Sequence, residues 1–179
     1  MGLGKDRSID TAGGWKNHLK RIARWKERSL SALASTSSCD IHDAADTVLA
    51  YFVWCHSFRD WLLQTKAIDR QTLDSKLSNY PDWKVCRDIA NRCRHYELTH
   101  NPSDKYWSMA REYDFWASVE KRPEKHLLFL VFGDQKLSVT DVIHSTFKMW
   151  NEVLEETIRP VDKSEVQGEN LEQERGSGN

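Results

Sequence analysis

The chain has 179 residues, of which 39% are hydrophobic and 30% are charged. This length and composition are typical of one domain with a substantial core. The formal net charge of −1 excludes an overall field that would attract nucleic acid. The charge is unevenly placed, however: residues 15–28 hold six Lys or Arg and one acid, whereas residues 151–179 hold eight acids and three bases. This asymmetry indicates either a basic contact surface with an acidic tail or two ends that partly neutralise each other.

The four cysteines, Cys39, Cys55, Cys86 and Cys93, contain no Cys-x-x-Cys pair. We expect buried free thiols in a reducing compartment rather than a disulfide framework. No apolar run approaches the ~20 residues needed to cross a bilayer, and residues 1–10 lack the hydrophobic region of a signal peptide. We therefore expect a cytoplasmic protein with no metal, no cofactor and no membrane partner.

Residues 1–13 contain three glycines and few apolar side chains, and we expect them to be flexible. A helical period begins at Trp15 and continues to Leu33, with the apolar residues on one side. The basic side of this helix supplies the candidate nucleic-acid-binding residues, which are Lys16, Lys20, Arg21 and Arg24. A basic amphipathic helix can lie on an RNA backbone or on a membrane, and it can also be an ordinary surface helix packed by its apolar stripe.

Residues 41–64 are predicted to form a long helix, with Asp40 as its N-cap. Its apolar residues cover most of the circumference, which is typical of a helix at the centre of a bundle. One polar stripe remains on this helix, and it includes His56 and Asp60.

A short helix is predicted at 69–78, and a longer one at 81–99, with Pro81 in its first turn and Asn101-Pro102 after its end. On the longer helix, polar residues at spacings of four, three and four fall on one line. These residues are Lys84, Asp88, Asn91 and His95, and Arg87 and Arg94 flank them.

A polar line of this kind is most simply the solvated side of an amphipathic helix. Polar groups on the buried 41–64 helix also need partners, however, because each unsatisfied group costs about 1–3 kcal/mol. We therefore expect His56 and Asp60 to approach Asn91 and His95 across a helix pair. In such a network His95 could move a proton and an adjacent Arg could stabilise charge at phosphorus, which is what metal-independent RNA cleavage requires.

Alternating aromatic and polar residues predict a strand at 105–117, and a second apolar strand is predicted at 126–132. We expect these two strands to pair as a β-hairpin at about 105–133. A final helix is expected to begin near Thr140-Asp141. Residues 160–179 are rich in Gly, Ser and Glu, and we expect them to form a disordered acidic tail. The expected domain therefore spans residues 14–159.

Several segments of the chain resemble HEPN-like domains, the higher eukaryote and prokaryote nucleotide-binding helical domains. FVWCHSFRDWLL (52–63) followed by VCRDIANRCRHYELT (85–99) is similar to their paired helices. LLFLVF (127–132) and WNEVLEETI (150–158) are similar to the ends of uncharacterised bacterial and phage members. The resemblance covers roughly residues 40–158. It implies a mainly α fold, a four-helix up-and-down bundle, here with an N-terminal amphipathic helix and a β-hairpin inserted before the last helix.

Many HEPN-like proteins are dimeric, metal-independent endoribonucleases of toxin–antitoxin or antiphage systems. Their motif is an Arg, usually followed by a polar residue such as Asn, with a His four to six residues on. One register places Asn91 and His95 on this motif, with Ala90 at the position of the Arg; another uses Arg94 and His100.

Two functions follow from these readings. The first is a non-catalytic helical module that binds RNA, a nucleotide or a partner protein such as an antitoxin or defence protein. The second is an active endoribonuclease or toxin. In the enzyme His95 or His100 would be the acid/base, Arg94 or Arg87 would supply positive charge, and Asn91, Asp88, His56 and Asp60, with Lys84 nearby, would set the geometry. The resemblance also implies a homodimer.

Overall fold

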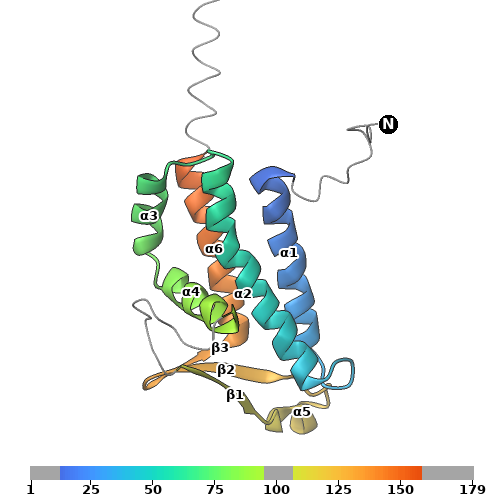
Figure 1. Cartoon of the computed structure of the whole chain (residues 1–179). Coiled ribbons are helices and arrows are strands. Elements are labelled where there is room, and N and C mark those ends of the chain that lie inside the picture. Colours follow the sequence, from blue (N-terminus) through green and yellow to red (C-terminus); the bar gives the residue numbers. More distant parts are fainter. Residues whose placement is uncertain (1–12, 95–106, 159–179) are drawn as a thin grey trace, which may run out of the picture.

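The computed structural model describes residues 13–94 and 107–158, and these form a mainly helical protein with one small antiparallel sheet (Figure 1). The elements follow the order α1 (Gly14–Leu33), α2 (Ile41–Gln64), α3 (Arg70–Ser78), α4 (Pro81–Arg94), β1 (Ser108–Glu112), α5 (Phe115–Glu120), β2 (Leu127–Phe132), β3 (Gln135–Ser138) and α6 (Val139–Thr157). The helices stand side by side above the sheet in Figure 1, and α5 lies at the lower end of the molecule.

The helix boundaries follow local capping chemistry. The Asp40 carboxylate accepts a hydrogen bond from the backbone N–H of His42 and so caps α2, as expected from the sequence. Asp69 caps α3 in the same way through Thr72 N–H. α4 begins at Pro81, whose missing N–H costs nothing in the first turn of a helix.

The core lies where α2 packs against α1 and α4. Helix α6 completes it and packs against α1, α3 and α4. Phe52, Phe58 and Trp150 are fully buried there. The Tyr51 hydroxyl crosses the core and donates to the Ile143 carbonyl oxygen at 2.9 Å, which satisfies a polar group that burial would otherwise leave unpaired. The expectation that the 41–64 helix is central is therefore confirmed.

The sheet has the order β1-β2-β3, and both pairs are antiparallel. Met109 pairs with Leu130 in the first ladder, and Leu130 pairs with Leu137 in the second. A tight turn at Gly133-Asp134 joins β2 to β3, and Gly133 adopts a positive φ of 53° that favours glycine. This turn brings the last strand directly into the N-terminus of α6.

The predicted strand at 105–117 is wrong beyond residue 112. Residues 115–120 form the short helix α5 instead, because the Asp114 carboxylate binds Arg122 and closes the chain into a compact loop. The third strand, Gln135–Ser138, was not expected, so the predicted two-stranded hairpin is in fact a three-stranded sheet.

Other expectations concern residues outside those described. They are the C-terminal part of the predicted 81–99 helix, nearly all of the N-terminus that was expected to be flexible, and the expected acidic tail at 160–179. Cys93 departs from the expected burial of the thiols, because it is exposed, whereas Cys55 and Cys86 are buried. None of the helices in the described ranges is long and apolar enough to span a bilayer.

Candidate functional site

The first candidate site lies between α2 and α4 and is centred on Arg94. Its guanidinium donates from Nη2 to Asn91 Oδ1 at 2.8 Å and lies 3.1 Å from Nδ1 of His56. Its Nε donates to the Ala90 carbonyl oxygen at 3.1 Å. Three acceptors from two helices thus orient one exposed arginine. His56 and Asn91, which the sequence places on separate helices, meet at this cation.

The imidazole of His56 also stacks on the indole of Trp83, with ring centroids 5.4 Å apart and planes 1° apart. Burial in this position, together with the positive charge of Arg94, lowers the pKa of His56 to about 4. The ring is therefore neutral at pH 7, so its Nδ1 can accept from Arg94. His56 acts as an acceptor that positions the guanidinium rather than as a charged acid.

Asp88, which the sequence places on the polar line of the 81–99 helix, does not lie on its solvated side. It is only 1% exposed, and Arg87 donates to its Oδ1 from Nε at 3.0 Å and from Nη2 at 2.9 Å. A carboxylate at this depth needs a cationic partner, since an unpaired buried charge is strongly unfavourable. The two arginines predicted to flank the stripe, Arg87 and Arg94, are therefore each held by dedicated acceptors.

The remaining predicted members of the polar network lie elsewhere. Asp60 is exposed and contacts Arg59 at 3.5 Å, while Arg59 pairs with both carboxylate oxygens of Asp74 at 2.7 and 2.8 Å. The approach of Asp60 to His95 stays a prediction, because His95 lies outside the described residues. His95 and His100, the two candidate acid/base residues, lie outside the described residues.

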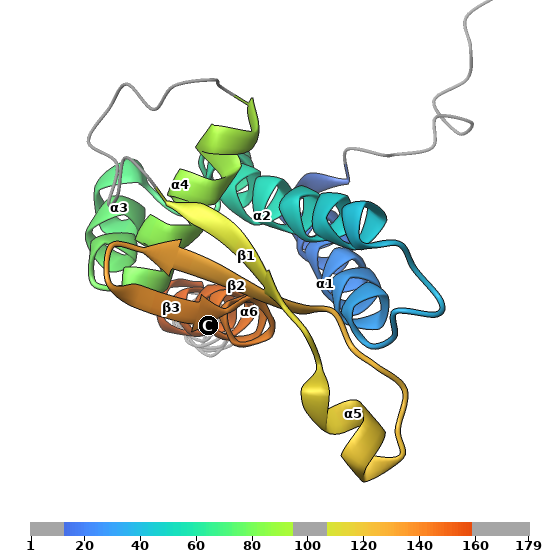
Figure 2. The same ribbon diagram turned by 90° about the horizontal axis from the view of Figure 1, so that it is seen from below.

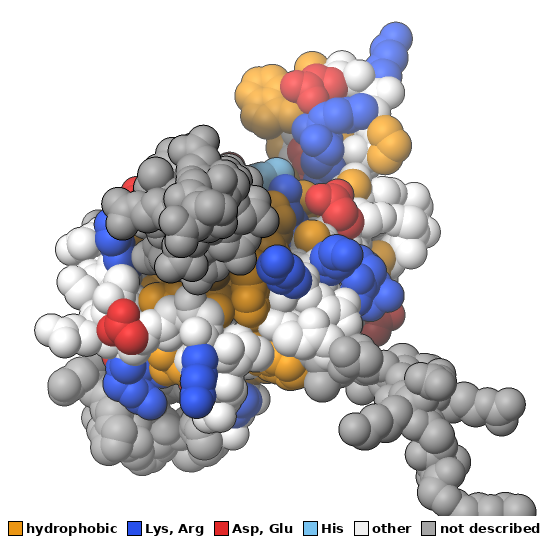
Figure 3. Space-filling model, turned by 90° about the horizontal axis from the view of Figure 1, so that it is seen from above, with side chains coloured by type: hydrophobic (Ala, Val, Ile, Leu, Met, Phe, Trp, Pro, Cys, Tyr) orange, Lys and Arg blue, Asp and Glu red, His pale blue; other side chains and the backbone are white. Residues whose placement is uncertain are grey.

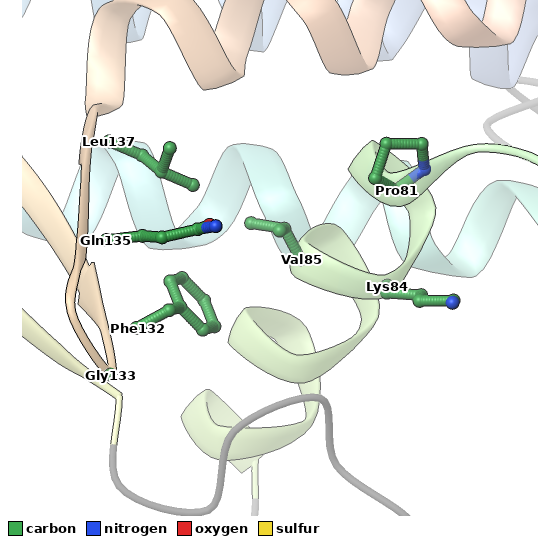
Figure 4. Close-up of a pocket in the computed structure, with 7 residues that line it drawn as sticks. All are labelled: Pro81, Lys84, Val85, Phe132, Gly133, Gln135 and Leu137. Carbon is green, nitrogen blue, oxygen red and sulfur yellow. The ribbon is translucent and has the colours of Figure 1, made fainter.

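Lys84 belongs to a different feature, a pocket of about 420 Å³ between α4 and the β2–β3 hairpin. Figure 4 shows Val85, Phe132, Gln135 and Leu137 around this space, while the end of the Lys84 side chain points away from them. Lys84 lines the pocket, whereas His56 on α2 contacts Trp83 and Arg94 of α4. The two residues therefore do not share the single polar network that was predicted.

The second candidate site is the outer face of α1. Lys16, Lys20, Arg24 and Arg28 recur every fourth residue and are all exposed, and we refer to them as the basic stripe. In the part of the chain that the structure describes, no carboxylate forms an ion pair with any of them. Figure 3 views the molecule from the end at which α1 begins and shows Lys and Arg side chains on this surface with hydrophobic groups between them. The sequence predicted Lys16, Lys20 and Arg24 here.

Tryptophans accompany the cations of α1. The Arg28 guanidinium lies 5.0 Å from the ring centre of Trp25, and the Lys16 ammonium lies 5.5 Å from that of Trp15. Arg21, the fourth candidate from the sequence, stands 4.7 Å over the ring of Trp54 on α2. The interleaving of aromatic and basic side chains was not used in the sequence analysis, although Trp15 and Trp25 are visible there beside Lys16 and Arg24.

The opposite side of α1 is fixed to α2 through a buried histidine. His18 is fully buried, and its Nε2 lies 3.0 Å from the Trp54 carbonyl oxygen. Its ring stacks on Phe58 and contacts Trp61, and burial lowers its pKa. The basic stripe is therefore presented by a helix whose inner face is firmly packed.

Within the described ranges, no group of three or more His, Cys, Asp or Glu side chains is arranged to hold a metal ion. Comparison of the chain with protein-family models, with curated proteins and with solved structures found no match. The chemistry of the two candidate sites therefore has to be argued from their geometry.

Proposed function

We propose that the chain is a non-catalytic helical module that binds RNA through the basic stripe of α1. The observation that carries this proposal is the run of four exposed cations, at intervals of four residues, without a described acidic partner. Like charges at this spacing destabilise a helix by about 0.2–0.5 kcal/mol per pair. A row of phosphates along the stripe would offset the repulsion between neighbouring cations, because each cation would then be attracted to a phosphate.

The proposal includes a HEPN-like four-helix up-and-down bundle, to which α1 adds the N-terminal amphipathic helix. Ala90, which stands where the active members of that family carry Arg, is fully buried on α4. A buried methyl group offers no positive charge to a phosphate, and this supports the non-catalytic reading. A setting in bacterial or phage defence, with an antitoxin or defence protein as partner, belongs to the same proposal.

The test is the salt dependence of RNA binding by the full chain. A labelled, unstructured single-stranded RNA of mixed sequence is titrated at several salt concentrations. Four phosphate contacts predict a log–log slope of about −2.8, at about −0.7 per contact. The double variant Lys20→Ala/Arg24→Ala should lower the magnitude of this slope by about 1.4 and weaken binding for every sequence alike.

Lys148→Ala and Lys125→Ala are the matched controls, because both lysines are exposed cations away from the stripe. Equal weakening by the controls and by the stripe variant, or no binding at low salt, would show that the proposal is wrong.

A second candidate is the metal-independent endoribonuclease, favoured by one observation: Arg94 is held ready by His56, Asn91 and Ala90. A fixed guanidinium can stabilise the extra negative charge of a phosphorane-like transition state. The second register of the motif would pair Arg94 with His100, and the first would use His95.

The enzyme is tested with purified protein and total RNA in the presence of a metal chelator. Cleavage that is lost in Arg94→Ala and in either His95→Ala or His100→Ala, but kept in Lys148→Ala, would establish it. If the wild-type protein binds RNA but leaves it intact, the endoribonuclease is excluded and the binding module is the function that remains.

A further inference from the structure

The basic stripe ends beside a second pocket. This pocket of about 580 Å³ lies between α1 and α2, and Arg28, the last cation of the stripe, forms part of its wall. The loop that joins the two helices also contributes to the wall. It lies at their lower end in Figure 1, and Figure 2 shows it on the side of the molecule away from α3 and α4. The pocket is therefore continuous with the basic stripe and separate from the site around Arg94.

The walls of this pocket are held in place by hydrogen bonds. Ser29 is fully buried, and its Oγ lies 2.9 Å from the Trp25 carbonyl oxygen and 3.1 Å from the Thr47 carbonyl oxygen. Because Trp25 and Thr47 both line the pocket, this hydroxyl joins its α1 wall to its α2 wall. In the loop, the Ser38 hydroxyl donates to the Ser35 carbonyl oxygen at 3.1 Å. A site that is formed in advance loses little conformational entropy when a ligand binds.

One wall of the pocket offers planar groups. The guanidinium of Arg28 lies 5.0 Å from the ring centre of the half-buried Trp25. The bases of single-stranded RNA stack on aromatic rings and on guanidinium planes. Ser31 and Ser38 add hydroxyl groups to the lining, and a hydroxyl can donate to or accept from the polar edge of a base. The pocket thus combines a surface for stacking with groups that can recognise a base edge.

The carboxylate of Glu27 indicates which part of a nucleotide the pocket holds. Glu27 lines the pocket and lies 3.8 Å from the Lys26 ammonium. A phosphate beside this carboxylate would be repelled, whereas a base is neutral and its amino groups can donate to the carboxylate oxygens. The cations of the stripe therefore suit the phosphates of a strand, and the pocket at Arg28 suits a base of the same strand.

We propose that the pocket binds one base of the RNA that lies on the basic stripe, and that it selects guanine. The inference rests on the proposed function of α1 and adds base selection to it. Guanine presents two neighbouring donors, N1–H and the N2 amino group, to the two oxygens of the Glu27 carboxylate. Uracil presents a single N3–H between two carbonyl oxygens, which the carboxylate repels. Adenine and cytosine each offer one amino group and rank between them.

The first test compares two RNAs of equal charge by fluorescence anisotropy with the full chain. One is an oligouridylate of about eight nucleotides, and the other carries guanine at one central position. The wild type should bind the guanine-containing RNA about tenfold more tightly. Glu27→Gln should reduce this ratio to about twofold or less. The ratio isolates base recognition, because the lost negative charge of Glu27 affects the phosphates of both RNAs alike.

The stacking wall is tested with Trp25→Leu, which keeps an apolar side chain but removes the ring. Binding of the guanine-containing RNA should weaken about tenfold with an unchanged salt slope, since no phosphate contact is lost. Ser31→Leu fills the pocket from an exposed position and should have the same effect without touching the core. Trp15→Leu is the matched control: Trp15 also partners a cation, Lys16, but does not line this pocket, so the guanine-to-uracil ratio should not change.

Free nucleosides separate the pocket from the stripe, because they carry no phosphate. Saturation-transfer NMR with guanosine or uridine at about 1 mM should give a signal for guanosine. The signal should persist in Lys20→Ala/Arg24→Ala and disappear in Ser31→Leu. Guanosine binding without RNA binding would retain the pocket and refute the proposed function of α1.

The opposite result, stripe-dependent RNA binding with equal affinity for the two RNAs, overturns the guanine pocket alone. A guanine preference that Glu27→Gln or Ser31→Leu leaves unchanged also overturns it. If neither guanosine nor RNA binds, both proposals are wrong.

Discussion

The cations of α4 and those of α1 differ in the contacts that hold them. On α4, Arg87 is paired with the buried Asp88, and Arg94 is held by His56 and Asn91. On α1, the four cations of the basic stripe are exposed and have no described acidic partner. The first arrangement fixes the direction of each guanidinium, whereas the second leaves charge free to follow a flexible polyanion.

The difference shows why residue type alone does not define a binding surface. A fixed cation matters most for stability where it is partly buried and its loss would leave a buried acidic partner unpaired. An exposed row of cations gains little from any single contact, but its combined attraction to phosphates rises with each member. The following three predictions test this contrast.

The largest effect is expected for Asp88→Ala. Removing the buried carboxylate takes away an acceptor of Arg87 and leaves a cavity beside α4, so the free energy of unfolding should fall by about 2–4 kcal/mol. Urea denaturation measures the change. Asp60→Ala is the control: Asp60 is an exposed acid beside Arg59, and its removal should cost less than about 0.5 kcal/mol. Equal losses in the two variants would mean that the Asp88–Arg87 pair is no different from a surface ion pair.

An intermediate effect is expected from His56, through pH. Its folded pKa of about 4 lies below the unfolded value of 6.5. Between these values the unfolded chain binds a proton that the folded chain does not, so stability should fall as the pH drops from 6.5 to 4 and level off below that. The contribution of His56 to this fall is roughly 1–3 kcal/mol.

The pH profile of His56→Phe isolates this contribution. Phenylalanine can stack on Trp83 but cannot titrate, so the fall should become smaller in the variant. A residual slope is expected from His18, whose pKa burial also lowers. An unchanged profile would mean that His56 is not held neutral by its contacts.

The smallest effect is expected on α1 and has the opposite sign. Arg24→Glu replaces two repulsive pairs, with Lys20 and with Arg28, by two attractive ones, so the free energy of unfolding should rise by about 0.8–2 kcal/mol at low salt. High salt should remove most of the gain. Lys148→Glu, which places the new acid beside Glu152, should not stabilise the chain. A loss of stability in Arg24→Glu would show that Arg24 has a structural partner.

The sequence by itself determined most of the helices. Asp40, Asp69 and Pro81 mark the starts of α2, α3 and α4, because capping and proline geometry depend only on neighbouring residues. The basic stripe was also visible, since exposed positions on a helix follow its period of 3.6 residues. The approach of His56 to Asn91 could be expected because polar groups on a central helix need hydrogen-bond partners, although both residues contact Arg94 rather than each other.

Only the tertiary structure decided which polar residue meets which. Asp88 and Lys84 lie on one line of the helical wheel, yet Asp88 is buried against Arg87 and Lys84 rims the pocket. The turn of the chain at Asp114 depends on Arg122, eight residues away. The short helix α5 therefore stands where the last part of the 105–117 strand was expected. Periodicity reports which side of an element is apolar, but the depth of burial and the choice of partner depend on the neighbouring elements, and these are set by packing of the whole chain.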